Sequence, residues 1–279
     1  MGQTNEHIAA AAPPAGWSAL AESLHEWLGG ITNVQLYWWM AWQSIRQRYA
    51  GSVIGPFWVS ISMGAFILAI GVVFGEIMGL RRDVFVPYLA SGVIVWSSIA
   101  GIAGESCRLL YGNRHILLSL RLPFSVLPMQ LLTNHLIIFA HNIVVYGVVT
   151  VVYDVPVTAG GLLMALAGLV LLMINAFWLV IVVALVCCRY RDFSEVVTIV
   201  LQFGFYLTPI VWHPSKLSIT EHLVVLNPFA HFLAVVREPL LGGAPTALNW
   251  IVVIGSAIGG LAFALAFYTR FRTRYIYWV

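Results

Sequence analysis

"VFVPYLASGVIVWSSIAGIAG", residues 84–104, carries no charged side chain and is bounded by Asp83 and Glu105. A membrane-crossing helix needs about 20 mainly apolar residues, so this segment is long enough to span a bilayer. Further runs of the same character lie at 53–75, 128–151, 161–187, 196–212 and 248–269. The sequence therefore predicts an all-α polytopic membrane protein with six transmembrane helices.

The composition agrees with this fold class. Of 279 residues, 61% are hydrophobic and only 9% are charged, whereas ordinary soluble domains carry roughly 25% charged residues. The net charge of +3 is too small to indicate a nucleic-acid partner. The three cysteines cannot form a disulfide framework or a four-ligand metal site, and we expect no metal.

Lysine and arginine indicate how the chain is oriented, because these residues are in excess in cytoplasmic loops. On one side of the predicted spans lie Arg81, Arg82, Lys216 and Arg237, and the other ten of the 14 basic residues lie on the opposite side. That side includes both termini. The sequence therefore predicts cytoplasmic termini.

The chain before the first span divides into two parts. Residues 1–33 are expected to form a flexible cytoplasmic tail with a short helix near 19–28, and residues 34–50 an amphipathic helix at the membrane interface. Its predicted apolar face consists of Val34, Trp38, Trp42, Ile45 and Tyr49. Such a helix either anchors the cytoplasmic flank or acts as a gate that offers aromatic rings to an amphipathic substrate. The six-span domain follows at 51–279.

Two other segments stand out. In the third span, Asn134 and His141 share a helical face, and they either bond to neighbouring helices or line a polar pathway. Between the fifth and sixth spans, residues 213–247 are long for a connection and are interrupted at Asn227-Pro228. Two short re-entrant helices at the periplasmic face fit this segment, with a structured loop as the alternative.

The sequence lacks the signature of ATP binding. Its single lysine, Lys216, follows no glycine-rich loop, so no GxxxxGK[ST] phosphate-binding motif exists in the chain. We expect no enzymatic activity and no cofactor in this chain. Any ATP and magnesium would be held by a partner.

Three segments together resemble the permease subunit of type-2 ABC exporters that move O-antigen and related lipid-linked polysaccharides. The first is the aromatic and basic helix that leads into YAGSVIGPFW (49–58), and the second is LLSLRLPFSVLPMQLLTNHLIIFAHNIVVY (117–146). The third is RYRDFSEVVTIVLQFGFYLTPIVW (189–212), followed by LNPFAHFLAVVREPLLGG (226–243). The resemblance implies a homodimer in the bacterial cytoplasmic (inner) membrane, coupled to two copies of a cytoplasmic ABC ATPase, with a channel at the dimer interface. The cargo would move from the cytoplasmic to the periplasmic side.

Alternatives remain for the cargo and for the class of transporter. The same fold could export teichoic acid, a capsule polymer or a drug-like lipid. A secondary transporter or channel would need no ATPase.

The resemblance also implies roles for particular residues. On the gate helix, where the substrate enters, they are Trp38, Trp39, Trp42, Arg46, Arg48 and Tyr49. In the loop 105–123, expected to couple to the ATPase, they are Glu105, Arg108, Tyr111, Arg114, His115 and Arg121. The arginines of this loop could equally be ordinary positive-inside charges.

Aromatic rings bind the apolar C–H faces of sugars, so a polysaccharide channel should be rich in aromatic residues and nearly uncharged. The candidates for the channel lining are Trp58, Trp96, Asn134, His141, Trp178, Phe205 and Tyr206. Those for the exit region are Trp212, Asn227, Arg237 and Glu238.

Overall fold

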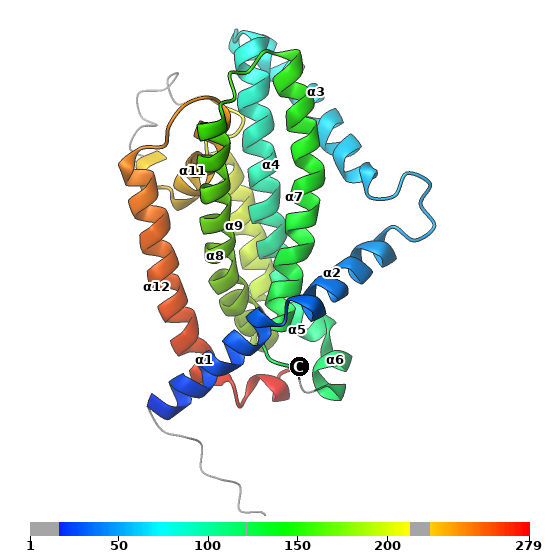
Figure 1. Cartoon of the computed structure of the whole chain (residues 1–279), viewed down its shortest axis with the longest axis vertical. Helices are drawn as coiled ribbons and strands as arrows, with labels where there is room; N and C mark the ends of the chain where they lie inside the picture. Colours follow the sequence, from blue (N-terminus) through cyan, green and yellow to red (C-terminus); the bar gives the residue numbers. More distant parts are fainter. Residues whose placement is uncertain (1–16, 121, 213–223) are drawn as a thin grey trace, which may run out of the picture.

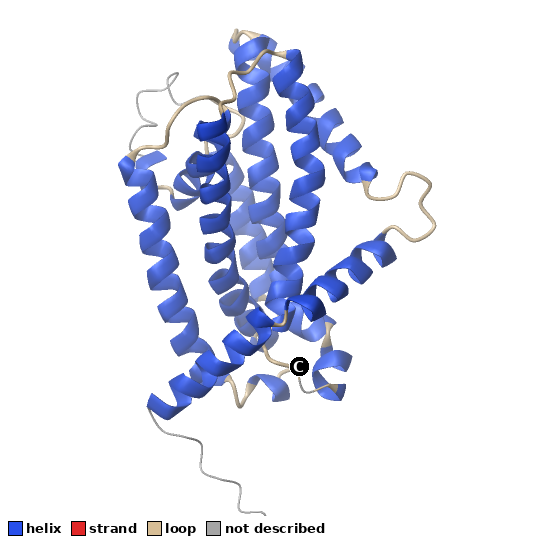
Figure 2. Ribbon diagram, in the orientation of Figure 1, coloured by secondary structure: helices blue, strands red, loops and turns tan. Residues whose placement is uncertain are grey.

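The structure, a computed structural model, describes residues 17–120, 122–212 and 224–279, and these ranges contain helices and no strands (Figures 1 and 2). The prediction of an all-α polytopic membrane protein is confirmed. The elements are α1 (Trp17–Thr32), α2 (Val34–Arg48), α3 (Phe57–Met78), α4 (Arg82–Ser106), α5 (Leu109–Gly112), α6 (Arg114–Ser119), α7 (Val126–Val152), α8 (Ala159–Arg189), α9 (Phe193–Leu207), α11 (Pro228–Leu240), α12 (Ala247–Phe271) and the 3₁₀ turn η2 (Tyr275–Tyr277).

Five of these helices, α3, α4, α7, α8 and α12, are long and apolar enough to cross a membrane. Each coincides with one of the predicted spans to within a few residues. The charged residues that bound the runs in the sequence lie at or near the helix ends because they are costly in the bilayer interior.

The fifth predicted span is shorter than expected. We placed it at 196–212, but α9 ends at Leu207 and has 15 residues. At 1.5 Å per residue it is about 22 Å long, against a hydrocarbon core of about 30 Å. Thr208 is extended, with φ −87° and ψ 137°, because the residue before a proline disfavours the helical region. The total of six spans therefore stays a prediction.

Helix α4 is the centre of the bundle (Figure 1). In its most apolar window 83% of the residues are buried, whereas the corresponding figure for α3 is 11%. The helices α3, α7, α8, α9 and α11 all contact α4. It therefore supplies the core, and α3 lies at the outside of the single subunit.

The two ends of the bundle differ in what they carry. The connection α4–α7 with α5 and α6, the start of α9 and the chain after α12 lie at the lower end in Figure 1, and α1 and α2 run obliquely across the lower part of the bundle. Together with the last turns of α8 and α12, these segments hold the described members of the larger basic group. The α3–α4 connection and α11 lie toward the upper end. The described basic residues therefore fall into the two groups on which the orientation prediction depends, and the orientation itself stays a prediction.

Helix α1 corrects the prediction of a flexible tail for the part that is described. It is longer than the expected 19–28 helix, and Trp27 is buried, with its ring 5.4 Å from that of Phe177 in an edge-on contact. The Ser125 hydroxyl donates to the Trp27 carbonyl at 2.7 Å. A Cβ on Gly30 would lie 2.0 Å from Ser125 Oγ, so glycine permits this close approach. Residues 1–16 lie outside the described residues.

The predicted pair of re-entrant helices is described in part. Helix α11 has 13 residues and is surrounded by α4, α8 and α12. It begins at Pro228, and the Asn227 side chain accepts a hydrogen bond from the Phe229 amide at 2.9 Å, a helix N-cap. Before it, residues 224–226 form a single helical turn. Residues 213–223, the first part of the segment 213–247 for which the two helices were predicted, lie outside the described residues.

Candidate functional site

Helix α2 has two apolar stripes with different surroundings. Tyr37, Ala41 and Ile45 are buried, in a helix that packs on α7. The indoles point away from this contact and are exposed: Trp38 to 51%, Trp39 to 60% and Trp42 to 48%. We predicted that Ile45 shares a face with the tryptophans, and the structure separates them. The small side chain of Ala41 lets the α2 backbone approach α7, which decides which stripe is buried.

The polar residues predicted on α2 are divided in the same way. Arg46 is exposed and points away from the bundle contact, whereas Tyr49 lines a shallow pocket together with Trp58 of α3. Arg48 instead contacts α4. The six residues predicted for the gate therefore do not act as one surface. The three tryptophans are exposed together, whereas Tyr49 lies beside α3 and Arg48 forms an ion pair with Glu105 of α4.

The ion pair of Arg48 is part of a small network around Glu105. The Arg48 guanidinium lies 3.1 Å from Glu105 Oε1, and His135 Nε2 lies 3.3 Å from Glu105 Oε2. His135 is 4% exposed. It fits beside α4 because residue 101 is glycine: a Cβ there would lie 2.6 Å from His135 Cε1. The network joins α2, α4 and α7, so a residue predicted for the gate contacts one predicted for coupling.

A polar cavity of about 230 Å³ opens beside this network. We call it the α2 pocket. Its lining comes from α2, from the end of α4 and the chain up to α6, and from α7: Ser44, Arg48, Glu105, Arg108, Leu109, Asn113, Gln130, Leu131 and Asn134. Two of these side chains, Gln130 and Asn134, have a buried carbonyl oxygen that accepts no hydrogen bond from the described residues.

A second polar cavity, of about 360 Å³, borders the same two charged residues, Glu105 and Arg108. It lies between the end of α4 and the start of α9, and Ser194, Glu195 and Thr198 of α9 contribute to its wall. Glu105 and Arg108 thus separate a pocket under α2 from a groove along α4 and α9.

The loop predicted to couple to an ATPase forms two short helices, α5 and α6. Leu109 and Leu110 on α5 are buried, whereas Leu118 on α6 and Leu120 after it are each 55% exposed. The predicted residues Arg108, Tyr111, Arg114 and His115 are all exposed. Arg121 lies outside the described residues. The loop therefore has one apolar side turned to the bundle and another turned outward.

The predicted channel residues fall into two groups. Trp58 is 52% exposed and Tyr206 66% exposed, while His141 and Phe205 are half-buried. Trp96 and Asn134 are each 6% exposed, enclosed by helices of this chain, and Trp96 stacks edge-on against Phe229 at 5.3 Å.

The channel lining stays a prediction, and within the single chain Trp96 and Asn134 are buried. Trp178 is also a packing residue, because its Nε1 donates to Asn175 Oδ1 at 3.1 Å and its ring lies over Gly260, where a Cβ would be 2.2 Å away.

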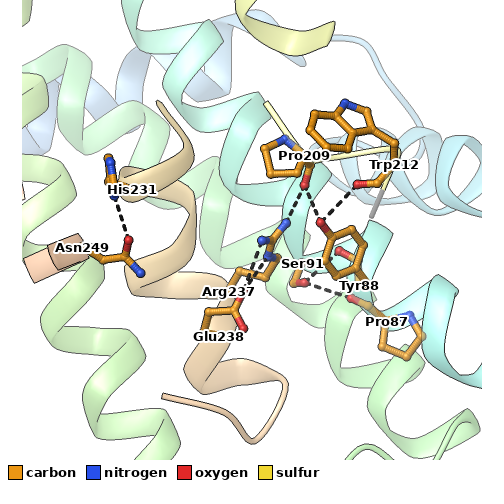
Figure 3. Close-up of polar contacts among 9 residues, drawn as sticks. All are labelled: Pro87, Tyr88, Ser91, Pro209, Trp212, His231, Arg237, Glu238 and Asn249. Atoms are coloured by element: carbon orange, nitrogen blue, oxygen red, sulfur yellow. Dashed lines mark hydrogen bonds and ion pairs between the residues drawn. The ribbon is translucent and has the colours of Figure 1, made fainter. Parts of the chain in front are cut away.

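Three of the four predicted exit residues, Trp212, Arg237 and Glu238, belong to one set of polar contacts at the opposite end of the bundle (Figure 3). Arg237, 5% exposed, donates to the Pro209 carbonyl at 2.6 Å and pairs with Glu238 at 3.1 Å. Its guanidinium lies 4.2 Å from the ring centroid of Tyr88. The Tyr88 hydroxyl lies 2.8 Å from the Pro209 carbonyl and 3.2 Å from that of Trp212. We call these five residues the Arg237 cluster.

The fourth residue, Asn227, belongs to a neighbouring set of contacts. Its amide donates to Thr208 Oγ1 at 3.0 Å. On α11, His231 binds Asn249 of α12 through Nδ1 at 2.7 Å (Figure 3) and the Val225 carbonyl through Nε2 at 2.9 Å. The Arg237 cluster and the Asn227 bond hold the segment after α9 against α4 and α11, and His231 joins α11 to α12.

Sequence reasoning missed several residues of these sites. Tyr88, Gln130 and the role of His135 were not predicted, because an isolated tyrosine, glutamine or histidine in an apolar run has no sequence signature. Only the rarity of polar side chains within spans points to them. In residues 17–120, 122–212 and 224–279, no three His, Cys, Asp or Glu side chains gather into a metal site.

Known proteins resemble this chain over most of its length. A profile of the family described as ABC-2 type transporter matches residues 35–241, from the first turn of α2 to just beyond α11. The "O-antigen export system permease protein RfbA" of Myxococcus xanthus is 22% identical over 194 residues, which cover 68% of this chain and 74% of the relative. Two proteins of the same name from Klebsiella pneumoniae are each 23% identical, over 208 and 215 residues, covering 72% of this chain and 78% of each relative.

Proposed function

This chain belongs to the ABC-2 type transporter family, as the membrane-spanning permease subunit of a type-2 ABC exporter, and we propose that its cargo is a lipid-linked polysaccharide of the O-antigen type. The observation that carries the choice of cargo is the similarity to O-antigen export permeases over about two thirds of the chain or more. Movement would run from the cytoplasmic to the periplasmic side of the bacterial inner membrane.

A permease of this family works with a separate ABC ATPase. We place the ATPase contact at α5 and α6, because Leu118 and Leu120 turn apolar side chains outward beside the exposed Arg114 and His115. An exposed apolar patch rimmed by polar residues is typical of a protein interface. Two ATPase copies would bind a permease homodimer, and they would hold the ATP and magnesium.

The least buried helices favour a homodimer formed through α3 and α9. Only 11% of the α3 window is buried, and Gly204 is the one buried residue of α9. Both helices pack on α4, and Trp58 and Tyr206 extend from them. In a dimer these aromatic rings would face a channel, where they could contact the apolar faces of sugar rings.

Helix α2 would act as the gate. Its exposed indoles would lie at headgroup level, where tryptophan is enriched in membrane proteins, and an amphipathic cargo arriving in the cytoplasmic leaflet would meet them first. The alternative role is a plain anchor. Replacing Trp38, Trp42 and Tyr49 together by alanine should reduce export while the ATPase still copurifies. Normal export in that variant would leave only anchoring.

The cargo is tested in a strain that lacks the gene. Surface glycan is followed on gels, and lipid-linked glycan is measured in the cytoplasmic leaflet. Loss of the surface polymer together with accumulation of its lipid-linked form inside supports the proposal. If both are unchanged, this chain does not export that cargo.

A further inference from the structure

Four helices of the bundle leave an apolar cavity between them. It has a volume of about 220 Å³ and lies where α4, α8, α11 and α12 meet. We call it the midspan cavity. Ile102 of α4, Leu172 of α8 and Phe229 and Phe232 of α11 contribute to its wall, and none of the described residues that line it comes from α3 or α9. It is therefore separate from the channel that we propose at the surface of those two helices.

The amide side chain in the wall of the cavity already has partners within the bundle. The Asn175 amide nitrogen donates to the carbonyls of Leu171 at 2.9 Å and Val253 at 3.1 Å, and Asn175 Oδ1 accepts from Trp178 Nε1 at 3.1 Å. These bonds use both amide hydrogens, so Asn175 leaves no donor for a ligand. An apolar cavity of about 150 Å³ stays dry and binds an apolar molecule as large as benzene. The midspan cavity therefore suits hydrocarbon and not water.

The cavity lies midway along the membrane-spanning helices. At 1.5 Å per residue, Asn175 is about 24 Å from the first residue of α8 and about 21 Å from the last. The hydrocarbon core of a bilayer is about 30 Å thick, so this point of α8 falls near the middle of the core. At that depth the protein is surrounded by the ends of lipid acyl chains.

The cavity also reaches the outer surface of the bundle. Leu172 in its wall is buried, whereas Ser256 of α12 is half-buried and Pro228, the first residue of α11, is exposed. The neighbouring outer surface of α12 is apolar, with Ile254 43% and Ile258 67% exposed. An apolar outer surface on a membrane-spanning helix faces lipid. The opening therefore meets hydrocarbon.

We infer that the midspan cavity binds the end of an acyl chain of a membrane phospholipid. The chain enters beside Ser256 and Pro228, and its last carbon atoms pack against Leu172, Phe229 and Phe232. No polar group of the protein loses a partner when the chain is bound. Because α11 supplies part of the wall, the bound chain also supports the start of that helix. The inference does not depend on the identity of the cargo.

The test is photo-crosslinking in nanodiscs that contain the full chain with its ATPase partner. Two phosphatidylcholine probes are compared, one with a diazirine at the end of an acyl chain and one with the diazirine next to the ester. The labelled residues are identified by mass spectrometry of peptides. We expect the terminal probe to label Leu172, Phe229 and Phe232. The second probe should leave them unlabelled, because its reactive group stays near the headgroups.

Filling the cavity should expel the chain. Ala176 lines the cavity and is 8% exposed, so Ala176→Leu places a larger apolar side chain inside it. Each methylene group that no longer fits weakens binding about fourfold, and labelling of Leu172 should fall roughly tenfold or more. Ser256→Leu fills the cavity from α12 and leaves α8 unchanged. Ala167→Leu is the matched control, because Ala167 is an exposed alanine of α8 outside the cavity, and its labelling should equal that of the unmodified protein.

Three results would overturn the inference. The first is equal labelling of Leu172 in Ala176→Leu, Ser256→Leu and Ala167→Leu. The second is a higher unfolding midpoint for Ala176→Leu with no labelling of Leu172 in the unmodified protein, which is the behaviour of an empty cavity. The third is loss of the label when a polyprenyl phosphate is added, which would assign the cavity to the tail of a lipid-linked cargo.

The crosslinking assay does not measure export. An empty cavity would therefore leave the proposed cargo standing, and unchanged glycans in the deletion strain would leave the phospholipid site standing.

Discussion

Replacing Arg237 by methionine removes the central charge of the Arg237 cluster while keeping an unbranched side chain of similar length. The substitution deletes a charged hydrogen bond to the Pro209 carbonyl, made at 2.6 Å in a nearly fully buried environment. Hydrogen bonds to charged groups contribute about 1.5–3 kcal/mol. The loss also leaves Pro209 with the Tyr88 hydroxyl as its other partner.

The other two contacts of Arg237, with the Tyr88 ring and with Glu238, make different contributions to the free energy of unfolding. Its position 4.2 Å from the Tyr88 ring centroid is worth about 1–2 kcal/mol in a desolvated site. The pair with Glu238 contributes less than about 1 kcal/mol, because that carboxylate is 35% exposed. The loss of these three contacts should lower the free energy of unfolding by about 3–5 kcal/mol. At about 2 °C or more per kcal/mol for a chain of this size, the unfolding midpoint should fall by roughly 6 °C or more.

The assay is thermal unfolding of the detergent-solubilised protein, followed by fluorescence-detected gel filtration. Arg82→Met is the matched control, because Arg82 lies at the same end of the bundle in an ion pair with Glu76 whose side chains are 56% and 68% exposed. Such exposed pairs contribute about 0–1 kcal/mol, so its midpoint should move by no more than roughly 2 °C.

Tyr88→Phe keeps the ring beneath the guanidinium and removes only the hydroxyl, so it should cost about 1 kcal/mol. Hydrogen exchange should become faster in peptides covering 208–212 in the Arg237→Met protein. If Arg237→Met and Arg82→Met have equal unfolding midpoints and hydrogen exchange in 208–212 is unchanged, the Arg237 cluster does not fix the segment after α9.

Two further predictions concern the end of the bundle near α2. Gly101→Ala should lower the free energy of unfolding by about 1–3 kcal/mol, because a Cβ there would lie 2.6 Å from Cε1 of His135. Gly104→Ala is the control. A Cβ there has no neighbour within 4 Å, so the change should be neutral or slightly stabilising. The same melting assay compares them, and equal shifts would contradict the close approach of α4 and α7. Replacing Leu118 and Leu120 together by serine should reduce copurification of the ATPase about tenfold or more. Leu163→Ser, which alters a residue 69% exposed at the other end, is the control, and undiminished copurification by the double variant would rule out α6 as the contact.

The predicted spans agree closely with the observed helices because the property that defines them is local. A run such as 84–104 must form a helix to satisfy its backbone in a bilayer, and the charges at its ends fix where it stops. The same holds for the separation of basic residues between the two ends. Lys216, in the smaller group, lies outside the described residues, so its position stays a prediction.

The candidate sites were predicted less completely. Arg48 and Glu105 were both named from the sequence, but for separate roles, and nothing in a linear pattern indicates that their side chains lie 3.1 Å apart. Trp96 was named for a channel because it is aromatic, yet it is buried against Phe229 of α11. An aromatic residue in a span has the same sequence pattern whether it faces lipid, a channel or another helix.

Four features could be predicted from the sequence alone: the fold class, the positions of the long helices, the basic end of the bundle and the family resemblance. Each depends on composition and on residues close together in the chain. Three other features required the three-dimensional arrangement: the stripe of α2 that is buried, the packing of α1 on the bundle, and the contacts of Glu105 with Arg48 of α2 and His135 of α7. Those features depend on small residues such as Gly30, Ala41 and Gly101, whose effect appears only when another helix approaches them.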